Sequence, residues 1–419
     1  MQGALLFASS TLGLAGLQSL RKQALINSHQ ISFISFESAS PESTLVVDCT
    51  HPHCRQLTHH LKLLGQRELH LDTVKFKGDS STEQVLLAIK ASSLSPFATV
   101  TSNHWDVDSF LCCWSCINPQ LALQHHDVIR EAARIGDFRE LWLGDDADSN
   151  SEASFKALAL VCWLNSEEKR LFYKPFESSI SRAGGEEDSD GKWEYFLPLF
   201  AEVVADPAKF CDQWQEEYLR VLQEYNMLHA QPDPGKGSPL CKIETFPDIS
   251  FVCVRGNCEP LHYYSLFSPS RGFDIVLSMW QGNRYELEIK YTTYITLASR
   301  PSLPRVELEA LAKTLNACEK ETQGGDVHWF ANRITDSGPI LRLDSASKHL
   351  SKAERYGHPF ERPIHPSSID PDVFLGTVVD YLRFALAEST PARKDWSWPE
   401  LHSYNKGIDW SAWQGIKSS

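Results

Sequence analysis

Histidine and aspartate side chains that can bind divalent metal ions are closely spaced in residues 103–109, which read NHWDVDS. Alternate residues of a chain leaving a strand point to the same side, so His104, Asp106 and Asp108 can present one imidazole and two carboxylates together. Such groups are ligands for a divalent cation. The pattern therefore predicts a metal site. The alternative is a strand-to-helix turn in which Asp106 or Asp108 caps the next helix.

A second group of candidate ligands precedes this segment. Asp48 ends a short apolar run, and the adjacent histidines His59 and His60 follow in a histidine-rich stretch. Neighbouring histidines point in different directions, so one can bind a metal ion while the other contacts a phosphate. A histidine-rich surface loop is the alternative. Asp137, in the sequence IGDF, is a further carboxylate in apolar surroundings, although it could equally cap a helix or pair with a cation.

Together these side chains supply enough nitrogen and oxygen ligands for two cations. Two cations about 3.5–4 Å apart can activate water and hold a phosphoryl group. Because two aspartates flank Val107, we expect Asp108 to bridge the cations and to be catalytic together with His59 and His60. The sequence predicts a metal-dependent phosphoesterase acting on a small anionic phosphodiester or phosphoanhydride. The alternative is a non-catalytic protein that binds a ligand or partner on the same scaffold.

The strands and helices expected around these residues indicate an α/β fold. Residues 45–48 and 98–101 are short apolar runs typical of strands, and residues 81–89 between them have helical spacing. A strand, helix, strand order favours a mostly parallel sheet with flanking helices, in which Asp48 and His104 follow strands at one edge. Further helices are expected at 110–116, at 121–135 and over most of 150–225, apart from a loop at 181–192.

The second half of the chain predicts a smaller α+β domain. Residues 273–292 read as a β-hairpin, a helix opens at Pro304, and 327–334 returns as a strand. With a linker at 231–239, four segments are expected. They are a variable N-terminal segment (1–40), the metal-binding α/β domain (41–230), the α+β substrate domain (240–345) and a C-terminal segment that wraps the others (346–419).

Three side chains of this second half are candidates for binding an anionic substrate. Arg300 and Arg342 can hold phosphate or carboxylate through two parallel hydrogen bonds, and His262 can stack on a base or sugar. The alternatives are that the arginines pair with nearby glutamates and that His262 and its aromatic neighbours belong to the core.

Composition excludes several classes of function. The net charge of −14 argues against binding a long nucleic acid, and no stretch is long and apolar enough for a membrane span. Eleven scattered cysteines imply no disulfide framework and favour a reducing compartment. The glycine motifs of P-loop nucleotide triphosphatases, Rossmann dehydrogenases and serine hydrolases do not occur. We expect a cytoplasmic protein, with organelle import through residues 1–23 or a plain surface helix there as alternatives. The sequence predicts no particular oligomeric state.

Three of these motifs resemble those of the DHH phosphoesterases. NHWDVDSFLCCW is similar to the first metal motif of that family, LVVDCTHPHCRQLTHH to a stretched form of its Asp-His-His motif, and ARIGDF to its later aspartate. The resemblance implies a manganese-dependent hydrolase. It assigns metal binding to Asp48, His104, Asp106, Asp108 and Asp137, and it places His59 or His60 near the phosphate.

Over its whole length the chain resembles an uncharacterised family of plant and bacterial proteins. The similarity is carried by TSNHWDVDSF, RIGDFREL and YELEIKYTTY, among other segments. It implies no established activity.

Overall fold

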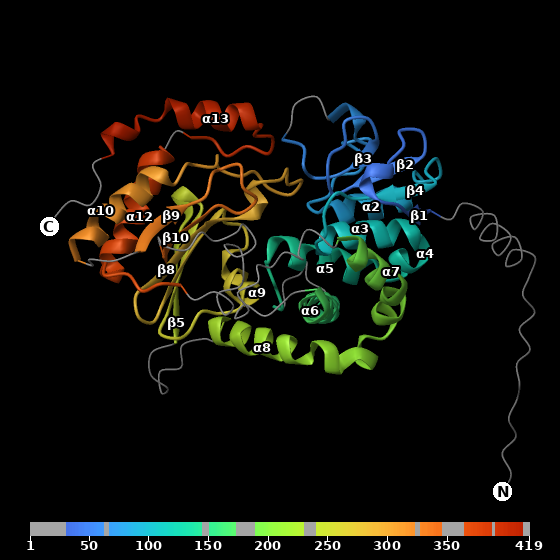
Figure 1. Cartoon of the computed structure of the whole chain (residues 1–419), viewed down its shortest axis with the longest axis horizontal. Helices are drawn as coiled ribbons and strands as arrows, with labels where there is room; N and C mark the ends of the chain where they lie inside the picture. The colour runs from blue at the N-terminus through green and yellow to red at the C-terminus, as the bar shows by residue number, and fades with distance from the viewer. Residues whose placement is uncertain are drawn as a thin grey trace, which may run out of the picture.

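The computed structural model describes residues 31–62, 67–144, 151–172, 189–229, 240–322, 327–345, 364–387 and 390–413. Residues 1–30 of the predicted N-terminal segment and the whole predicted linker 231–239 lie outside these ranges, so the domain boundaries stay predictions. We call residues 31–229 the N-terminal lobe and residues 240–413 the C-terminal lobe. Figure 1 shows that each lobe has its own sheet.

The sheet of the N-terminal lobe has four parallel strands in the order β1-β4-β2-β3. These are β1 (Ser32–Phe33), β2 (Thr44–Val47), β3 (Arg55–Leu57) and β4 (Thr99–Thr101). Leu45 of β2 pairs with Val100 of β4 on one side and with Arg55 of β3 on the other. The predicted parallel sheet is confirmed. Because β2 and β4 are parallel neighbours, Asp48 and the residues that follow β4 lie at the same edge.

Helices α2 and α3 pack against this sheet, and α4 and α5 pack against these two helices. They are α2 (Ser81–Lys90), α3 (Val107–Ile117), α4 (Pro119–Gln124) and α5 (His126–Phe138). Ser80 caps α2, since its side chain accepts a hydrogen bond from the backbone N–H of Glu83. The prediction of one helix over 121–135 was wrong. The chain breaks at His125, beside a second histidine, and both have low helix propensity.

Three longer helices complete the N-terminal lobe: α6 (Ser151–Phe172), α7 (Ser189–Ala205) and α8 (Cys211–His229). Of the predicted loop at 181–192, residues 181–188 lie outside the described residues and the last four begin α7, where Ser189 and Asp190 suit a helix N-terminus. The core of the lobe joins the sheet to α3, α5, α6 and α7. In the described residues, no helix is long and apolar enough to cross a membrane.

The sheet of the C-terminal lobe has six strands in the order β5-β6-β7-β8-β10-β9. They are β5 (Cys241–Phe246), β6 (Phe251–Gly256), β7 (Ile275–Trp280), β8 (Arg284–Ile289), β9 (Val327–Ala331) and β10 (Ile340–Ser345). Only β6 and β7 pair in parallel among these strands. The predicted hairpin is confirmed as β7–β8, and its turn needs the positive φ of Gly282 (76°) and Asn283 (57°).

The helices of the C-terminal lobe are α9 (Tyr263–Leu266), α10 (Glu309–Thr322), α12 (Pro371–Ala385) and α13 (Trp398–Gly407). The helix expected to open at Pro304 begins five residues later. The preceding backbone is engaged elsewhere, because Glu307 donates its N–H to the Asn405 side chain. The strand expected at 327–334 ends at Ala331, where Asn332 turns its side chain to the backbone of Ile340. Helices α10 and α12 cover the apolar face of the sheet.

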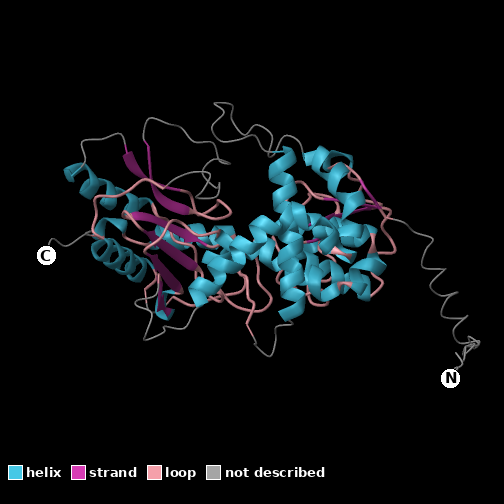
Figure 2. Ribbon diagram, turned by 90° about the horizontal axis from the view of Figure 1, so that it is seen from below, coloured by secondary structure: helices cyan, strands magenta, loops and turns pink. Residues whose placement is uncertain are grey.

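Short 3₁₀ turns connect several elements, and the one directly after β8 reaches the N-terminal lobe. They are η1 (Phe36–Ser38), η2 (Arg67–Leu69), η3 (Pro207–Phe210), η4 (Pro247–Ile249), η5 (Ser268–Ser270), η6 (Tyr291–Thr293) and η7 (Trp410–Ala412). Figure 2 shows the strands of the C-terminal lobe gathered at one end of the molecule and helices filling its middle.

Candidate metal centre

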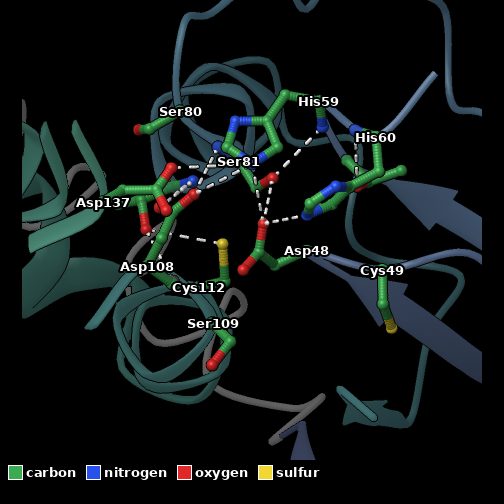
Figure 3. Close-up of polar contacts among 12 residues, drawn as sticks. Asp48, Cys49, His59, His60, Ser80, Ser81, Asp108, Ser109, Cys112 and Asp137 are labelled. Atoms are coloured by element: carbon green, nitrogen blue, oxygen red, sulfur yellow. Dashed lines mark hydrogen bonds and ion pairs between the residues drawn. The ribbon is translucent and has the colours of Figure 1, made fainter. Parts of the chain in front are cut away.

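Asp48 lies at the centre of the candidate site because of where β2 ends. The residue follows the strand, is fully buried, and takes a left-handed backbone conformation with φ of 54°. Aspartate and asparagine tolerate this conformation better than most residues. The turn directs the Asp48 side chain over the carboxyl edge of the sheet, toward residues that follow β3 and β4 (Figure 3).

Seven side chains meet at this edge in three overlapping groups. Within each group, one ligand atom per residue lies within 4.8 Å of the others. The groups are Asp48 with His59 and His60, Asp48 with His104 and Asp106, and His59 with Asp108 and Asp137. All seven residues were predicted from the sequence, and Asp48 is the carboxylate that two groups share.

The first position for a cation lies beside His59. The Nδ1 atom of His59 is 2.8 Å from the carbonyl oxygen of Asp79, which can only accept, so Nδ1 carries the proton. The other ring nitrogen, Nε2, then faces oxygen atoms of Asp48 at 3.2 Å, Asp137 at 3.7 Å and Asp108 at 3.9 Å. Two ligands of one ion, each about 2.1 Å from it, lie about 3.0–3.4 Å apart. The distance from His59 to Asp48 lies in this range, and the distances to Asp137 and Asp108 are longer than it.

The second position lies beside His104. Its Nδ1 is 2.8 Å from the Asn103 side-chain oxygen, and its Nε2 faces Asp106 Oδ2 at 3.1 Å and Asp48 Oδ2 at 3.4 Å. His59 faces Oδ1 of Asp48, whereas His104 faces Oδ2. One carboxylate therefore has an oxygen directed at each position, which is the arrangement that a bridging ligand requires.

His60 differs from His59 in its exposure. The His59 side chain is fully buried, whereas 17% of the His60 side chain is exposed and its Nε2 lies 3.6 Å from Asp48 Oδ1. The hydroxyl of Tyr291, from the C-terminal lobe, contacts Nε2 of both histidines, at 3.4 and 3.2 Å. His59 can reach a metal ion but not a ligand in solution, and His60 can reach both.

Asp106 and Asp108 combine ligand geometry with helix capping. Asp106 is the N-cap of α3, where one oxygen accepts the Ser109 N–H, and its other oxygen faces His104. Both oxygens of Asp108 accept the first N–H groups of α2, from Ser81 and Thr82. The start of α2 thus uses both Asp108 oxygens as acceptors. The bridging role expected of Asp108 stays a prediction.

Two buried carboxylate oxygens of the cluster lack hydrogen-bond donors. Among the described residues, Oδ2 of Asp48 and Oδ2 of Asp137 have no hydrogen-bond partner. A buried carboxylate oxygen without a donor costs free energy unless a positive charge lies beside it. These two atoms face the imidazoles of His104 and His59, the residues next to the two proposed cation positions.

Burial and neighbouring charges shift the pKa values of several residues of the cluster. Burial opposes ionisation of Asp48, but the imidazoles of His104, His59 and His60, which face its carboxylate, hold its pKa well below the usual range. Burial also opposes the charge on His59, yet the surrounding carboxylates raise its pKa to about 10. Burial and the neighbouring Asp48 raise the pKa of Asp108 to about 7, and burial also raises the pKa of Asp137 well above its usual range.

A cavity of about 660 Å³ opens onto the cluster. Its lining includes Asp48, His60, His104, Asp106 and Asp137, but neither His59 nor Asp108. Side chains that sequence analysis did not select complete the wall: Lys62 and Arg139 from the N-terminal lobe, and Glu288, Tyr291, Tyr294 and Trp398 from the C-terminal lobe. Tyr291 follows the end of β8, and strand ends are where sites form, so its position could have been noticed.

Comparison with known proteins identifies the family. A family model matches residues 29–393. The chain belongs to the family of unknown function DUF6687. The prediction of an uncharacterised family is confirmed. No curated protein and no solved structure matches the chain, and the resemblance of this DUF6687 protein to the DHH phosphoesterases stays a prediction.

The predicted substrate-binding residues of the DUF6687 protein lie outside the cavity lining. Arg300 donates to Asp274 at 2.7 Å, and Arg342, only 2% exposed, donates to Glu286 at 2.7 Å. His262 is buried and its Nε2 lies 3.0 Å from Glu217. Each partner is a carboxylate, and for Arg342 it is a glutamate, as the alternative reading of the arginines expected. The arginine that does line the cavity is Arg139.

Proposed function

We propose that this protein is a metal-dependent phosphoesterase that hydrolyses a small anionic phosphodiester or phosphoanhydride. The observation that carries the proposal is the Asp48 carboxylate, buried between His59 and His104 with one oxygen directed at each of two clusters of ligand atoms. Its Oδ2 has no hydrogen-bond donor among the described residues, so a cation beside it would offset the cost of burying the charge.

The donor set fits hard or borderline divalent cations, of which Mn²⁺ is our choice. Carboxylate oxygens, which are four of the seven candidate ligands, suit manganese, and no cysteine belongs to the three ligand groups of the described residues. His59, Asp108 and Asp137 would hold one ion, His104 and Asp106 the other, and Asp48 both. When bound, two such cations activate water and offset the charge of a phosphoryl group.

The chain itself would orient the ligands and the substrate. The Asp79 carbonyl fixes the ring of His59, and Asp79 is held in turn by Ser299, whose N–H and hydroxyl donate to its carboxylate at 2.8 and 2.6 Å. Outer hydrogen bonds of this kind set the direction of a metal-binding imidazole. His60 and the Tyr291 hydroxyl face the cavity and can hydrogen-bond a phosphoryl oxygen there.

Mn²⁺ binding and hydrolysis test the proposal. Isothermal titration should detect Mn²⁺ binding to the wild type, and a panel of oligonucleotides, cyclic dinucleotides and polyphosphates should include a substrate. Asp48→Asn keeps a side chain that tolerates the left-handed backbone but removes the charge. It should lower Mn²⁺ affinity and turnover more than about 100-fold, since even outer-shell changes cost 10–100-fold.

Asp127→Asn is the matched control, because Asp127 lies on α5 with its side chain 57% exposed and paired with His126. It should bind Mn²⁺ like the wild type. Hydrolysis that survives Asp48→Asn would overturn the proposal. Mn²⁺ binding without turnover of any panel member would instead favour the non-catalytic ligand-binding protein.

A further inference from the structure

Arg139 stands out among the cavity residues because the backbone is strained to place it there. It ends α5 in a left-handed conformation with φ of 57°, an uncommon choice for a long side chain. Two residues close to Arg139 in the sequence, Asp137 and Glu140, have different surroundings. Asp137 joins the metal cluster, whereas Glu140 is buried in an ion pair with Lys290 of the C-terminal lobe. Arg139 is left facing the cavity.

Stacking on two aromatic rings holds the Arg139 guanidinium in place more than its hydrogen bonds do. It lies over the rings of Tyr263 and Phe267, at 5.1 and 5.6 Å from their centroids. Its hydrogen bonds to other described residues come from one nitrogen, Nη1, which donates to both oxygens of Glu288 at 3.3 Å. A guanidinium carries five N–H donors, and strong carboxylate pairs are shorter and use two nitrogens. Most of its donors remain available.

Glu288 is a poor permanent partner for this arginine. Its side chain is 9% exposed, and burial raises its pKa to about 7 despite the nearby Arg139 charge. Gly338 covers the carboxylate so closely that an added Cβ would lie 2.9 Å from Glu288 Oε1. The loop at Gly338 is itself fixed, since Arg305 donates to the backbone carbonyl of Ser337 at 2.6 Å. Glu288 thus occupies a rigid, partly enclosed position against Arg139.

Arg139 makes no contact with the cluster residues in the described part of the chain. Its partners are Glu288, Tyr263 and Phe267, which belong to the C-terminal lobe, while the cluster lies at the edge of the N-terminal sheet. The two sites nevertheless line one cavity. A ligand held at the cluster by one phosphoryl group could therefore extend to Arg139 with another part of the molecule.

We infer that Arg139 is a substrate-recognition residue that binds a second anionic group, phosphate or carboxylate, of a small substrate whose first phosphoryl group lies at the metal cluster. The ligand group pairs with the guanidinium N–H donors that the contact to Glu288 leaves free. This inference rests on the proposed function for the first phosphoryl group. It assigns the substrate to the class of bis-anionic small molecules.

Alkane bisphosphonates of graded length test the inference, because their charge stays constant while their reach changes and they cannot be hydrolysed. Calorimetry with Mn²⁺ should find one spacer length that binds at least 10-fold more tightly than methylphosphonate. Arg139→Gln should weaken that ligand by about 10- to 100-fold and leave methylphosphonate unchanged. Phosphonocarboxylates of the same lengths show whether the second group is preferred as phosphate or carboxylate.

Two further variants separate recognition from structure. Arg130→Gln removes a cation from the same helix outside the cavity lining and should bind every ligand like the wild type. Glu288→Gln removes the competing carboxylate and should strengthen bisphosphonate binding, whereas a purely structural ion pair would predict weaker binding. Bisphosphonates that bind no better than methylphosphonate, or equally well to Arg139→Gln, would overturn the inference.

Repeating the titrations without Mn²⁺ distinguishes the two proposals. Arg139-dependent binding that needs no Mn²⁺, with no Mn²⁺ binding to the protein, would support this inference and contradict the proposed function. Mn²⁺-dependent methylphosphonate binding with no effect of Arg139→Gln would do the reverse.

Discussion

At the scale of single residues, Asp106 has two roles that one substitution can separate. One oxygen caps α3 and the other faces His104. Asparagine caps helices as well as aspartate does, so Asp106→Asn should change the free energy of unfolding of the metal-free protein by less than about 0.5 kcal/mol. It should still weaken Mn²⁺ binding at the His104 position, because the anionic oxygen is gone.

Urea unfolding without metal and calorimetric Mn²⁺ titration measure the two roles of Asp106 separately. Asp106→Ala is the complementary variant, since it also removes the cap and should cost about 1 kcal/mol. Equal Mn²⁺ affinity in Asp106→Asn and the wild type would show that Asp106 is a cap only.

The same residues show what the sequence could predict. Spacing placed His104 and Asp106 correctly, because residues that follow parallel strands meet at one edge of the sheet. It could not decide between Asp48 and Asp108 as the shared carboxylate. That depends on the start of α2, whose N–H groups take both oxygens of Asp108. Nor could it find the contact between His59 and Tyr291, which are 232 residues apart.

At the scale of elements, the position of Asp137 depends on how closely α5 approaches α3. Gly136 makes this approach possible, since an added Cβ would lie 2.4 Å from the Cβ of Val107. Alanine normally stabilises a helix by about 1 kcal/mol relative to glycine. At Gly136 the clash should outweigh that gain, so Gly136→Ala should destabilise the protein by about 1–3 kcal/mol and weaken Mn²⁺ binding through Asp137.

Gly376 of α12 provides the opposite control. It is exposed, and an added Cβ would meet nothing within 4 Å. Gly376→Ala should therefore stabilise the protein by about 0.5–1 kcal/mol and leave Mn²⁺ binding unchanged. Thermal unfolding of both variants, each with and without Mn²⁺, makes the comparison. If Gly136→Ala stabilised the protein as Gly376→Ala does, the close packing of α3 and α5 would be wrong.

At the scale of the whole molecule, both lobes are needed to complete the cavity. Contacts between them surround it: Asp79 binds Ser299, Glu140 pairs with Lys290, and Lys62 donates to the Trp396 carbonyl. The sequence predicted the hairpin that carries Lys290, because alternating residues reveal a strand. It could not predict which arginine faces the site, since Arg300 and Arg342 are taken by carboxylates that only the fold brings near them.

Glu288, buried between the lobes, should make the stability of the whole molecule depend on pH. Its pKa of about 7 in the folded protein lies above the ordinary value of 4.5, because burial disfavours the charged form. A raised carboxyl pKa means that the folded state binds the proton more tightly. The resulting stability is present below about pH 4.5 and is lost as the pH rises through about 7, by about 3 kcal/mol.

Glu288→Gln isolates this contribution, since glutamine is neutral in both the folded and unfolded states. The other charged residues that surround position 288 are the same in both proteins, so their titration largely cancels in the difference between the two unfolding free energies. They are Arg139, Lys290, Arg305 and Glu286. Urea unfolding at pH 5, 6, 7 and 8 should show the variant gaining stability over the wild type as the pH rises. The gain should occur mainly between pH 5 and 7. A difference that stays constant over this range would mean that Glu288 is already ionised in the folded protein at pH 5, held there by Arg139 as a firm ion pair rather than as a displaceable one.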